Sequence, residues 1–383
     1  MAFATAAFGD NVRKIIDEWS VPGFAIAVVQ GDNIRSKILP NDFVLQDPYL
    51  TANVTVEDIL SHRAGDPGHD DALFGQKAAQ PDNAKSITRK LRHLPFNKPL
   101  RCNYQYSNPM FTVATHLIET VTGESYPDVV RRRIWEPLGM LNTYHDVTGV
   151  EAGNAKDRLS MGDHWDKEKN SYLAIPSYAR PEGQGAGCVF SSVSDYAKWV
   201  RALLKRAGPL SEEAHKEMVS GRTIIPYEGN EALPRYGHAL YALGLQVETY
   251  RGYPLIGHDG SYSGFKASMR YLPDQDWGVV MFGNADDAYS VAQILFHQLV
   301  DGVIEVPEED QTDWAAYWRK CWKDDKEERH KDDPDLLLSE SLEATYVPLE
   351  ELASGYVHAG YGTLSLMFTD GKLEADCSDR AAA

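Results

Sequence analysis

The chain has 383 residues, which is enough for one large domain or two of ordinary size. Hydrophobic residues make up 43% and charged residues 25%, proportions typical of a globular protein. The formal net charge of −18 argues against nucleic acid or an anionic membrane surface as a partner, because both require a basic face.

The four cysteines are scattered and form no CxxC pair, which indicates reduced thiols and no metal-binding pattern. We therefore expect neither a metal nor a cofactor. No basic segment followed by an apolar one begins at Met1, and no stretch approaches the roughly 20 apolar residues of a membrane-spanning helix. A cytoplasmic location without membrane attachment is expected.

The apolar periodicity predicts the elements in chain order. Residues 8–19 have helical spacing, and the apolar run 24–29 predicts a buried strand whose hairpin partner is 33–38. The middle of the chain is helical. Thr55 can cap one helix and Asn108 another that Gly123 would end. A third helix can be capped by either of two serines, Ser192 or Ser194.

After about residue 236 the period becomes that of strands, and a helix follows at 288–303. This order predicts an α+β fold in which an antiparallel sheet is flanked by terminal helices and carries an inserted helical domain. We expect residues 24–29 to lie in the same sheet as residues 262–271. The extended segments are 239–249, 253–258, 262–271 and 277–282. The predicted sheet lobe, helical lobe and charged linker are residues 1–48 with 236–320, residues 49–235 and residues 321–340.

Two short patterns contain candidate site residues. Tyr106 and Asn108 are two apart, so an extended segment would project both to one side, where a phenol and a carboxamide can relay a proton and hold a carbonyl. In His258-Asp259-Gly260, the glycine would let a substrate lie against the strand, and the next N–H, that of Ser261, could point at a carbonyl oxygen. Alternatively, Tyr106 and His258 are structural.

The neighbours Ser61 and His62 are interpreted as a helix end, because adjacent helical residues do not face each other as a nucleophile and its base must.

Six segments in one order resemble the serine β-lactamase and penicillin-binding-protein-like family, in its class C and esterase branch, and are similar to fungal β-lactamase-related esterases and lovastatin-type acyltransferases. The resemblance covers most of residues 8–305 and implies a β-lactamase/transpeptidase-like fold. Residues 341–383 look like the truncated start of a C-terminal β-barrel-like extension. The six segments are VPGFAIAVVQ, VTVEDILSHRAG, YQYSN, VTGESYPDVVRRRIWEPLGM, GQGAGCVFSSVSDYAKWV and GHDGSYSGF.

The resemblance implies acyl transfer on a small-molecule ester, amide or lactam. Tyr106 matches the proton-relay tyrosine and Asn108 the residue that contacts the acyl group. His258 and Gly260 match the third motif, Asp259 lies within it, and the N–H of Ser261 matches half of the oxyanion hole.

The family's Ser-x-x-Lys segment is missing from its expected place between residues 31 and 48. The single Ser-x-x-Lys match, Ser263 to Lys266, falls on a predicted strand, where positions i and i+3 face opposite sides. The pair Ser86 and Lys90 is one residue too long.

Three hypotheses remain open: an esterase or acyltransferase whose sequence is incomplete or altered, a nucleophile-less protein that binds an acyl compound, and a non-hydrolytic isomerase or cyclase that uses Tyr106 and His258. The missing segment would leave a cavity between the helices at 108–122 and 195–206, or a second subunit would cover it.

Overall fold

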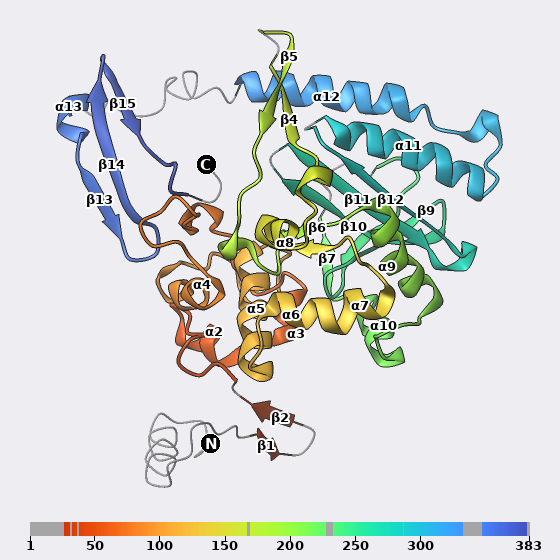
Figure 1. The fold of residues 1–383 in the computed structure, drawn as a ribbon, viewed down its shortest axis with the longest axis horizontal. Helices are drawn as coiled ribbons and strands as arrows, with labels where there is room; N and C mark the ends of the chain where they lie inside the picture. Colours follow the sequence, from red (N-terminus) through yellow and green to blue (C-terminus); the bar gives the residue numbers. More distant parts are fainter. Residues whose placement is uncertain are drawn as a thin grey trace.

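The computed structural model describes residues 27–30, 33–36, 38–166, 169–226, 233–262, 264–285, 287–331 and 347–380. These residues form a six-stranded antiparallel sheet, a helical region and a C-terminal three-stranded sheet (Figure 1). The six strands lie in the order β12-β11-β10-β9-β8-β7. Their bounds are β7 (Thr223–Ile225), β8 (Ala239–Tyr241), β9 (Gln246–Tyr250), β10 (Tyr253–Tyr262), β11 (Phe265–Leu272) and β12 (Trp277–Gly283).

Helices cover the sheet and fill the middle of the chain (Figure 1). Their bounds are α2 (Pro48–Asn53), α3 (Val56–Leu60), α4 (Ala84–Lys90), α5 (Asn108–Thr122), α6 (Tyr126–Val130), α7 (Glu136–Leu138), α8 (Asp146–Ala152), α9 (Val193–Lys205), α10 (Glu212–Met218), α11 (Ala288–Val303), α12 (Trp314–Lys331) and α13 (Leu349–Leu352). Two small strand pairs, β3 (Tyr144–His145) with β6 (Val189–Phe190) and β4 (Gly162–Asp166) with β5 (Ser171–Ile175), complete the middle region.

Consecutive residues of β10 pack against helices on opposite faces of the sheet. Leu255 lies in a buried cluster with Phe296 of α11 and Trp314 of α12. Ile256, the next residue, lies in a second cluster with Val200 of α9. Because side chains alternate along a strand, helices cover both faces, and the predicted α+β class with helix 288–303 against the sheet is confirmed.

The turns set the registers in this sheet. Arg251 and Gly252 have φ values of 50° and 85°, the positive pair that a two-residue hairpin turn requires, so Tyr250 pairs with Tyr253. The predicted segment 239–249 is two strands, β8 and β9, because the chain turns at Gly244, where φ is 81°. The sheet also includes β7, which the prediction had placed in the helical lobe.

Helix caps follow the sequence closely, with one shift. Thr55 caps α3 through a capping box, Ser192 caps α9, and Gly123 ends α5 with φ 69°. The N-cap of α5 is Ser107, whose hydroxyl accepts from the Met110 N–H, so the prediction of Asn108 as the cap is wrong by one residue. The shorter serine side chain reaches the free N–H of the first turn.

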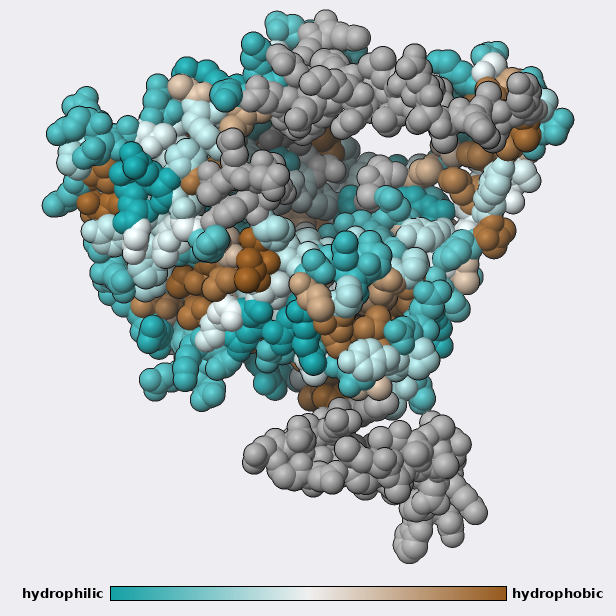
Figure 2. Space-filling view, turned by 180° about the vertical axis from the view of Figure 1, so that it is seen from behind, coloured by the Kyte–Doolittle hydropathy of each residue, from teal (hydrophilic) through white to brown (hydrophobic). Residues whose placement is uncertain are grey.

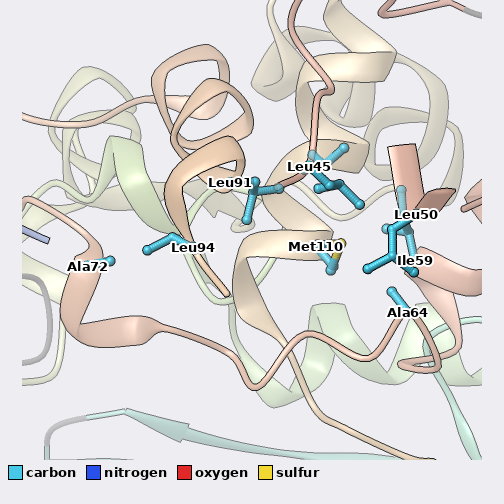
Figure 3. Close-up of a cluster of buried hydrophobic side chains, with 9 residues drawn as sticks. Leu45, Leu50, Ile59, Ala64, Ala72, Leu91, Leu94 and Met110 are labelled. Carbon is cyan, nitrogen blue, oxygen red and sulfur yellow. The ribbon is translucent and has the colours of Figure 1, made fainter. Parts of the chain in front are cut away.

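The core of the helical region brings together segments that are far apart in the sequence (Figure 3). Its nine buried side chains are Leu45, Leu50, Ile59, Ala64, Ala72, Leu91, Leu94, Met110 and Val113. Tyr361 of the C-terminal region packs against this cluster. The predicted late strands form the three-stranded sheet β13 (Gly355–His358), β14 (Gly362–Thr369) and β15 (Lys372–Ala375).

The N-terminal hairpin is the largest departure from the prediction. Strand β1 (Ala27–Gln30) pairs with β2 (Asn33–Ser36), as expected, but the two form a sheet of their own. Residues 27–29 therefore do not share a sheet with 262–271 among the described residues, and that prediction is wrong. Pairing of segments that are close in the sequence costs less loop-closure entropy than pairing with a distant strand. The predicted helix 8–19 lies outside the described residues.

The first part of the predicted linker 321–340 is helical, since α12 continues to Lys331, and residues 332–340 lie outside the described part. Hydrophilic side chains cover much of the described surface in Figure 2, with apolar groups in separate patches. Within the described ranges, no helix has both the length and the apolar character to cross a membrane. The expected cavity between the helices at 108–122 and 195–206, or its cover by a second subunit, stays a prediction.

His297 predicts a pH dependence of stability. Its ring is fully buried and stacked on Trp314, and burial lowers its pKa to about 4. Between pH 6.5 and about 4 the unfolded state binds a proton that the folded state does not, so this group should destabilise the protein by about 1.4 kcal/mol per pH unit as the pH falls. Urea unfolding of wild type and His297→Leu across this range should show a shallower pH slope in the variant; equal slopes would contradict the assignment.

Candidate functional site

The side chains of Tyr106 and His258 meet although they are 152 positions apart in the chain. Their ring centroids are 6.2 Å apart. Tyr106 precedes α5 in the helical region, and His258 lies on β10. The structure therefore brings together the two residues that the sequence placed in separate motifs. In the described part of the chain no hydrogen bond engages the Tyr106 hydroxyl, and the residue is 42% exposed, so the phenol is accessible to a ligand.

His258 is held as a neutral imidazole. Its Nε2 lies 3.0 Å from the Tyr241 hydroxyl, and its Nδ1 lies 2.5 Å from the carbonyl oxygen of Asp259. Since a carbonyl can only accept, Nδ1 carries the proton and Nε2 accepts from Tyr241. Burial lowers the pKa of His258, which keeps the ring uncharged at neutral pH. Sequence reasoning missed Tyr241, because nothing distinguishes it from any tyrosine of a predicted strand.

His62 lies at the centre of the site, which the interpretation as a simple helix end did not foresee. Its ring centroid is 4.2 Å from that of Tyr106 and 4.6 Å from that of Tyr241. Its Nδ1 accepts the backbone N–H of Ser107 at 3.0 Å. Burial, and next the proximity of His258, lower the pKa of His62 to about 3. A neutral His62 can therefore accept from Ser107 throughout the neutral range.

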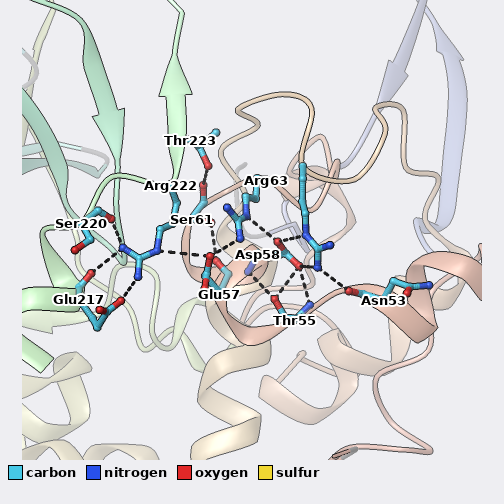
Figure 4. Close-up of polar contacts among 11 residues, drawn as sticks. Asn53, Thr55, Glu57, Asp58, Ser61, Arg63, Glu217, Ser220, Arg222 and Thr223 are labelled. Atoms are coloured by element: carbon cyan, nitrogen blue, oxygen red, sulfur yellow. Dashed lines mark hydrogen bonds and ion pairs between the residues drawn. The ribbon is translucent and has the colours of Figure 1, made fainter. Parts of the chain in front are cut away.

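A polar network holds the turn that carries His62 (Figure 4). The Thr223 hydroxyl of β7 donates to the carbonyl of Ser61 at 2.8 Å, which ties the end of α3 to the sheet. Asp58 is fully buried and accepts from Arg63 and Arg101. The Ser61 hydroxyl donates to the carbonyl of Glu57 at 2.6 Å. The neighbours Ser61 and His62 are therefore not a nucleophile and its base.

Asn108 is oriented by an acid that the sequence analysis did not single out. Its amide nitrogen donates to both carboxylate oxygens of Asp70, at 3.3 and 3.2 Å. Burial raises the pKa of Asp70. Burial of Tyr106 and the nearby Asp70 charge both raise the pKa of the Tyr106 phenol, so it remains a proton donor at neutral pH.

The residues that follow His258 divide between the two faces of the sheet. Asp259 accepts from Arg270 at 2.7 Å, and Ser261 accepts from Lys266 at 2.6 Å. By alternation these side chains point away from the face of His258. The Asp259 carboxylate is thus placed in a structural ion pair on the opposite face. The Ser261 side chain is thus engaged on the opposite face, and the role of its backbone N–H as half of an oxyanion hole stays a prediction.

The second half of β10 is open on one side. Its described pairing with β9 ends at Gly257, whereas its pairing with β11 continues to Tyr262. Gly260 and Ser261 are exposed. A Cβ at Gly260 would lie 3.3 Å from that of Ala267, on the same face as His258. The missing side chain leaves room for a ligand along this stretch of backbone.

The alternative pair Ser86 and Lys90 does not supply a nucleophile to this site. Ser86 donates to Asp82 at 2.7 Å, and Lys90 pairs with the same carboxylate. Both residues belong to α4. Ser263 lies outside the described residues. The described residues also contain no group of three or more histidine, cysteine, aspartate or glutamate side chains that could hold a metal ion.

Comparison with known proteins matches residues 31–301 to the β-lactamase family. An unguisins hydrolase of Aspergillus violaceofuscus is 33% identical over 96% of this chain and 66% of its own length. Another, from Aspergillus campestris, is 29% identical over 97% of this chain and 80% of its length. The octameric penicillin-binding protein homologue of Pyrococcus abyssi superposes with a TM-score of 0.54 at 22% identity, covering 76% of each chain, which shows a shared fold.

The structural role of the Asp259–Arg270 ion pair can be tested by measuring the free energy of unfolding. Asp259→Ala would leave Arg270, which is 7% exposed, without its carboxylate, and should lower the free energy of unfolding by about 3 kcal/mol. Ser261→Ala, on the same face but exposed, should change it by less than about 0.5 kcal/mol. Urea unfolding measures both, and equal midpoints would contradict a structural role for Asp259.

Proposed function

Because the chain belongs to the β-lactamase family, a family of serine hydrolases, we propose that it binds the carbonyl group of a small-molecule amide, ester or lactam beside Tyr106 and His258. The observation that carries the proposal is the convergence of these two rings, 6.2 Å apart, next to the open half of β10. The similarity to two unguisins hydrolases supports a hydrolase-type substrate.

Each residue has a role that its geometry supports. The substrate backbone would lie along β10 against Gly260, with its carbonyl oxygen accepting from the N–H of Ser261. The hydroxyl of Tyr106 is accessible and protonated, so it would donate a proton to the substrate or relay one from it. Asn108, oriented by Asp70, would contact the acyl group. His258, neutral and hydrogen-bonded to Tyr241, would line the proposed carbonyl site as an uncharged polar wall.

We further propose that the chain as written forms no acyl-serine intermediate. The interval from 31 to 48 lacks the Ser-x-x-Lys helix, and Ser61 and Ser86 donate their hydroxyl protons to a carbonyl and a carboxylate. Ser261 lies 2.6 Å from Lys266, but its side chain is on the strand face opposite His258. The alignment with the A. campestris hydrolase spans 441 residues, more than the 383 of this chain, so that relative contains internal segments without a counterpart here. This supports the loss of a nucleophile-bearing segment, leaving binding without the covalent step.

A second candidate is proton transfer without a nucleophile, as in an isomerase or cyclase. It is favoured by one observation: Tyr106 and the Tyr241–His258 pair form a set of neutral proton-handling groups that needs no serine. Turnover of a ligand without any covalent adduct would distinguish this candidate from simple binding.

The absence of a nucleophile predicts no labelling by a fluorophosphonate or by fluorescent penicillin. Intact-mass measurement should show an unmodified chain, whereas insertion of the corresponding Ser-x-x-Lys segment of an unguisins hydrolase between residues 36 and 39 should create the adduct, esterase activity on p-nitrophenyl acetate and a higher Tm. A stoichiometric adduct on the unaltered chain would refute the proposal; Ser261, beside Lys266, would be the first residue to examine.

Non-covalent binding of benzylpenicillin tests the carbonyl site directly. Gly260→Val adds a side chain on the face of His258 and should weaken the affinity at least about tenfold, while a β-branched residue remains compatible with the strand. Lys266→Met, on the opposite face, serves as the matched control and should leave the affinity within about twofold. If calorimetric titration gave equal Kd values for both variants, β10 would not be part of the binding site.

A further inference from the structure

The loop of residues 65–74 lies between the C-terminal sheet and the segment that carries Tyr106, and we name it the bridging loop. It contains three residues with positive φ: Gly65 at 88°, Gly68 at 98° and His69 at 51°. A residue other than glycine rarely adopts this backbone conformation unless contacts hold it there. The contacts on the two sides of the loop therefore decide its shape.

On the side of the site, two acids of the bridging loop hold the motif segment. Asp66, which is 1% exposed, accepts the hydroxyl proton of Ser107. Asp70 accepts from the amide of Asn108. A Cβ at Gly68 would come within 3.3 Å of the carbonyl oxygen of Tyr106, so the two backbones pass closely. The loop thus holds Ser107 and Asn108, the two residues that follow Tyr106, and passes close to the Tyr106 backbone.

On the other side, the C-terminal region holds the bridging loop. Phe74 forms a β-bridge with Arg380, whose guanidinium lies 4.4 Å from the centre of the Phe74 ring. The N–H of Gly75 donates to the carbonyl of Asp379 at 2.9 Å. The Tyr361 hydroxyl lies 2.5 Å from Nδ1 of His69.

His69 connects the two sides through its two ring nitrogens. Nε2 donates to the carbonyl of Pro95 at 2.8 Å and lies 3.5 Å from the second carboxylate oxygen of Asp66. Because a carbonyl can only accept, Nε2 carries a proton, and the Tyr361 hydroxyl contacts the other ring nitrogen, Nδ1. Tyr361 therefore holds the ring orientation in which Nε2 of His69 faces Asp66.

We propose that Tyr361 is a positioning residue for Tyr106 and Asn108, acting through His69, Asp66 and Ser107. The C-terminal sheet is then part of the site's support, although none of its residues needs to contact a ligand. The roles of Tyr106 and Asn108 toward a ligand rest on the proposed function. The chain of contacts from Tyr361 to Ser107 does not depend on it.

Amide hydrogen exchange tests the connection. The N–H of Ser107 donates to His62, and the N–H of Met110 donates to the Ser107 hydroxyl oxygen. Protection of these two amides from exchange therefore reports whether the segment keeps its position. Tyr361→Phe removes one hydroxyl and should speed their exchange about fivefold, the equivalent of one net hydrogen bond. The matched control is Tyr356→Phe, which removes a hydroxyl bonded within the C-terminal region to Leu352 and should leave exchange within about twofold.

A double variant shows whether His69 transmits the effect. Asparagine tolerates positive φ, so His69→Asn keeps the loop conformation while removing the ring nitrogen that contacts Tyr361. It should speed exchange by itself, and adding Tyr361→Phe should then change nothing further. Additive effects, or equal exchange in Tyr361→Phe and Tyr356→Phe, would overturn the proposal.

Benzylpenicillin binding separates this inference from the proposed function. If the wild type binds, Tyr361→Phe should raise Kd about threefold or more and Tyr356→Phe should not. Unchanged binding in Tyr361→Phe would overturn a positioning role in ligand binding. If the wild type does not bind, the proposed function fails for this ligand, and the exchange measurements alone decide on the connection.

Discussion

The hydrogen bond from the Ser107 amide to the buried ring of His62 is the interaction on which the site depends. It requires a neutral imidazole, which burial ensures by lowering the pKa of His62 to about 3. Around this ring pack Tyr106 from the helical region and Tyr241 from the sheet. Tyr241 in turn donates to His258. One buried histidine therefore aligns the two parts of the molecule that meet at the proposed carbonyl site.

Side chains alternate between the two faces of β10, so neighbouring residues have different roles. His258 and Gly260 face the site, whereas Asp259 binds the buried Arg270 on the other face. Because Arg270 lies on β11, this ion pair joins the two neighbouring strands β10 and β11. The three residues 258–260 thus combine a proposed ligand-facing surface with the ion pair that holds the strand in place. Loss of function after their mutation would therefore not by itself identify a ligand contact.

In the proposed site, Tyr106 and His258 can donate and accept protons, whereas Ser261, which contacts Lys266, has its side chain on the opposite face of the strand. Ser61, Ser86 and Ser107 all spend their hydroxyl protons on backbone or carboxylate acceptors. Acyl transfer through a covalent intermediate needs a nucleophile with a base at hydrogen-bonding distance. On the proposed function, the acyl transfer typical of the family would require a Ser-x-x-Lys segment that residues 31–48 do not contain. The N-terminal hairpin at this place is paired only with itself among the described strands.

The sequence by itself determined the α+β class, the caps at Thr55 and Ser192, the meander of strands and the pairing of Tyr106 with His258 in one site, because these depend on local periodicity, capping chemistry and family motifs. It could not show His62, Tyr241 or Asp70 as partners of Tyr106, since their roles arise from burial and from contacts between distant segments. Only the tertiary structure decided that the hairpin at 27–36 stands apart from the main sheet and that Tyr361 reaches His69, because both follow from three-dimensional packing that no spacing of residues along the chain encodes.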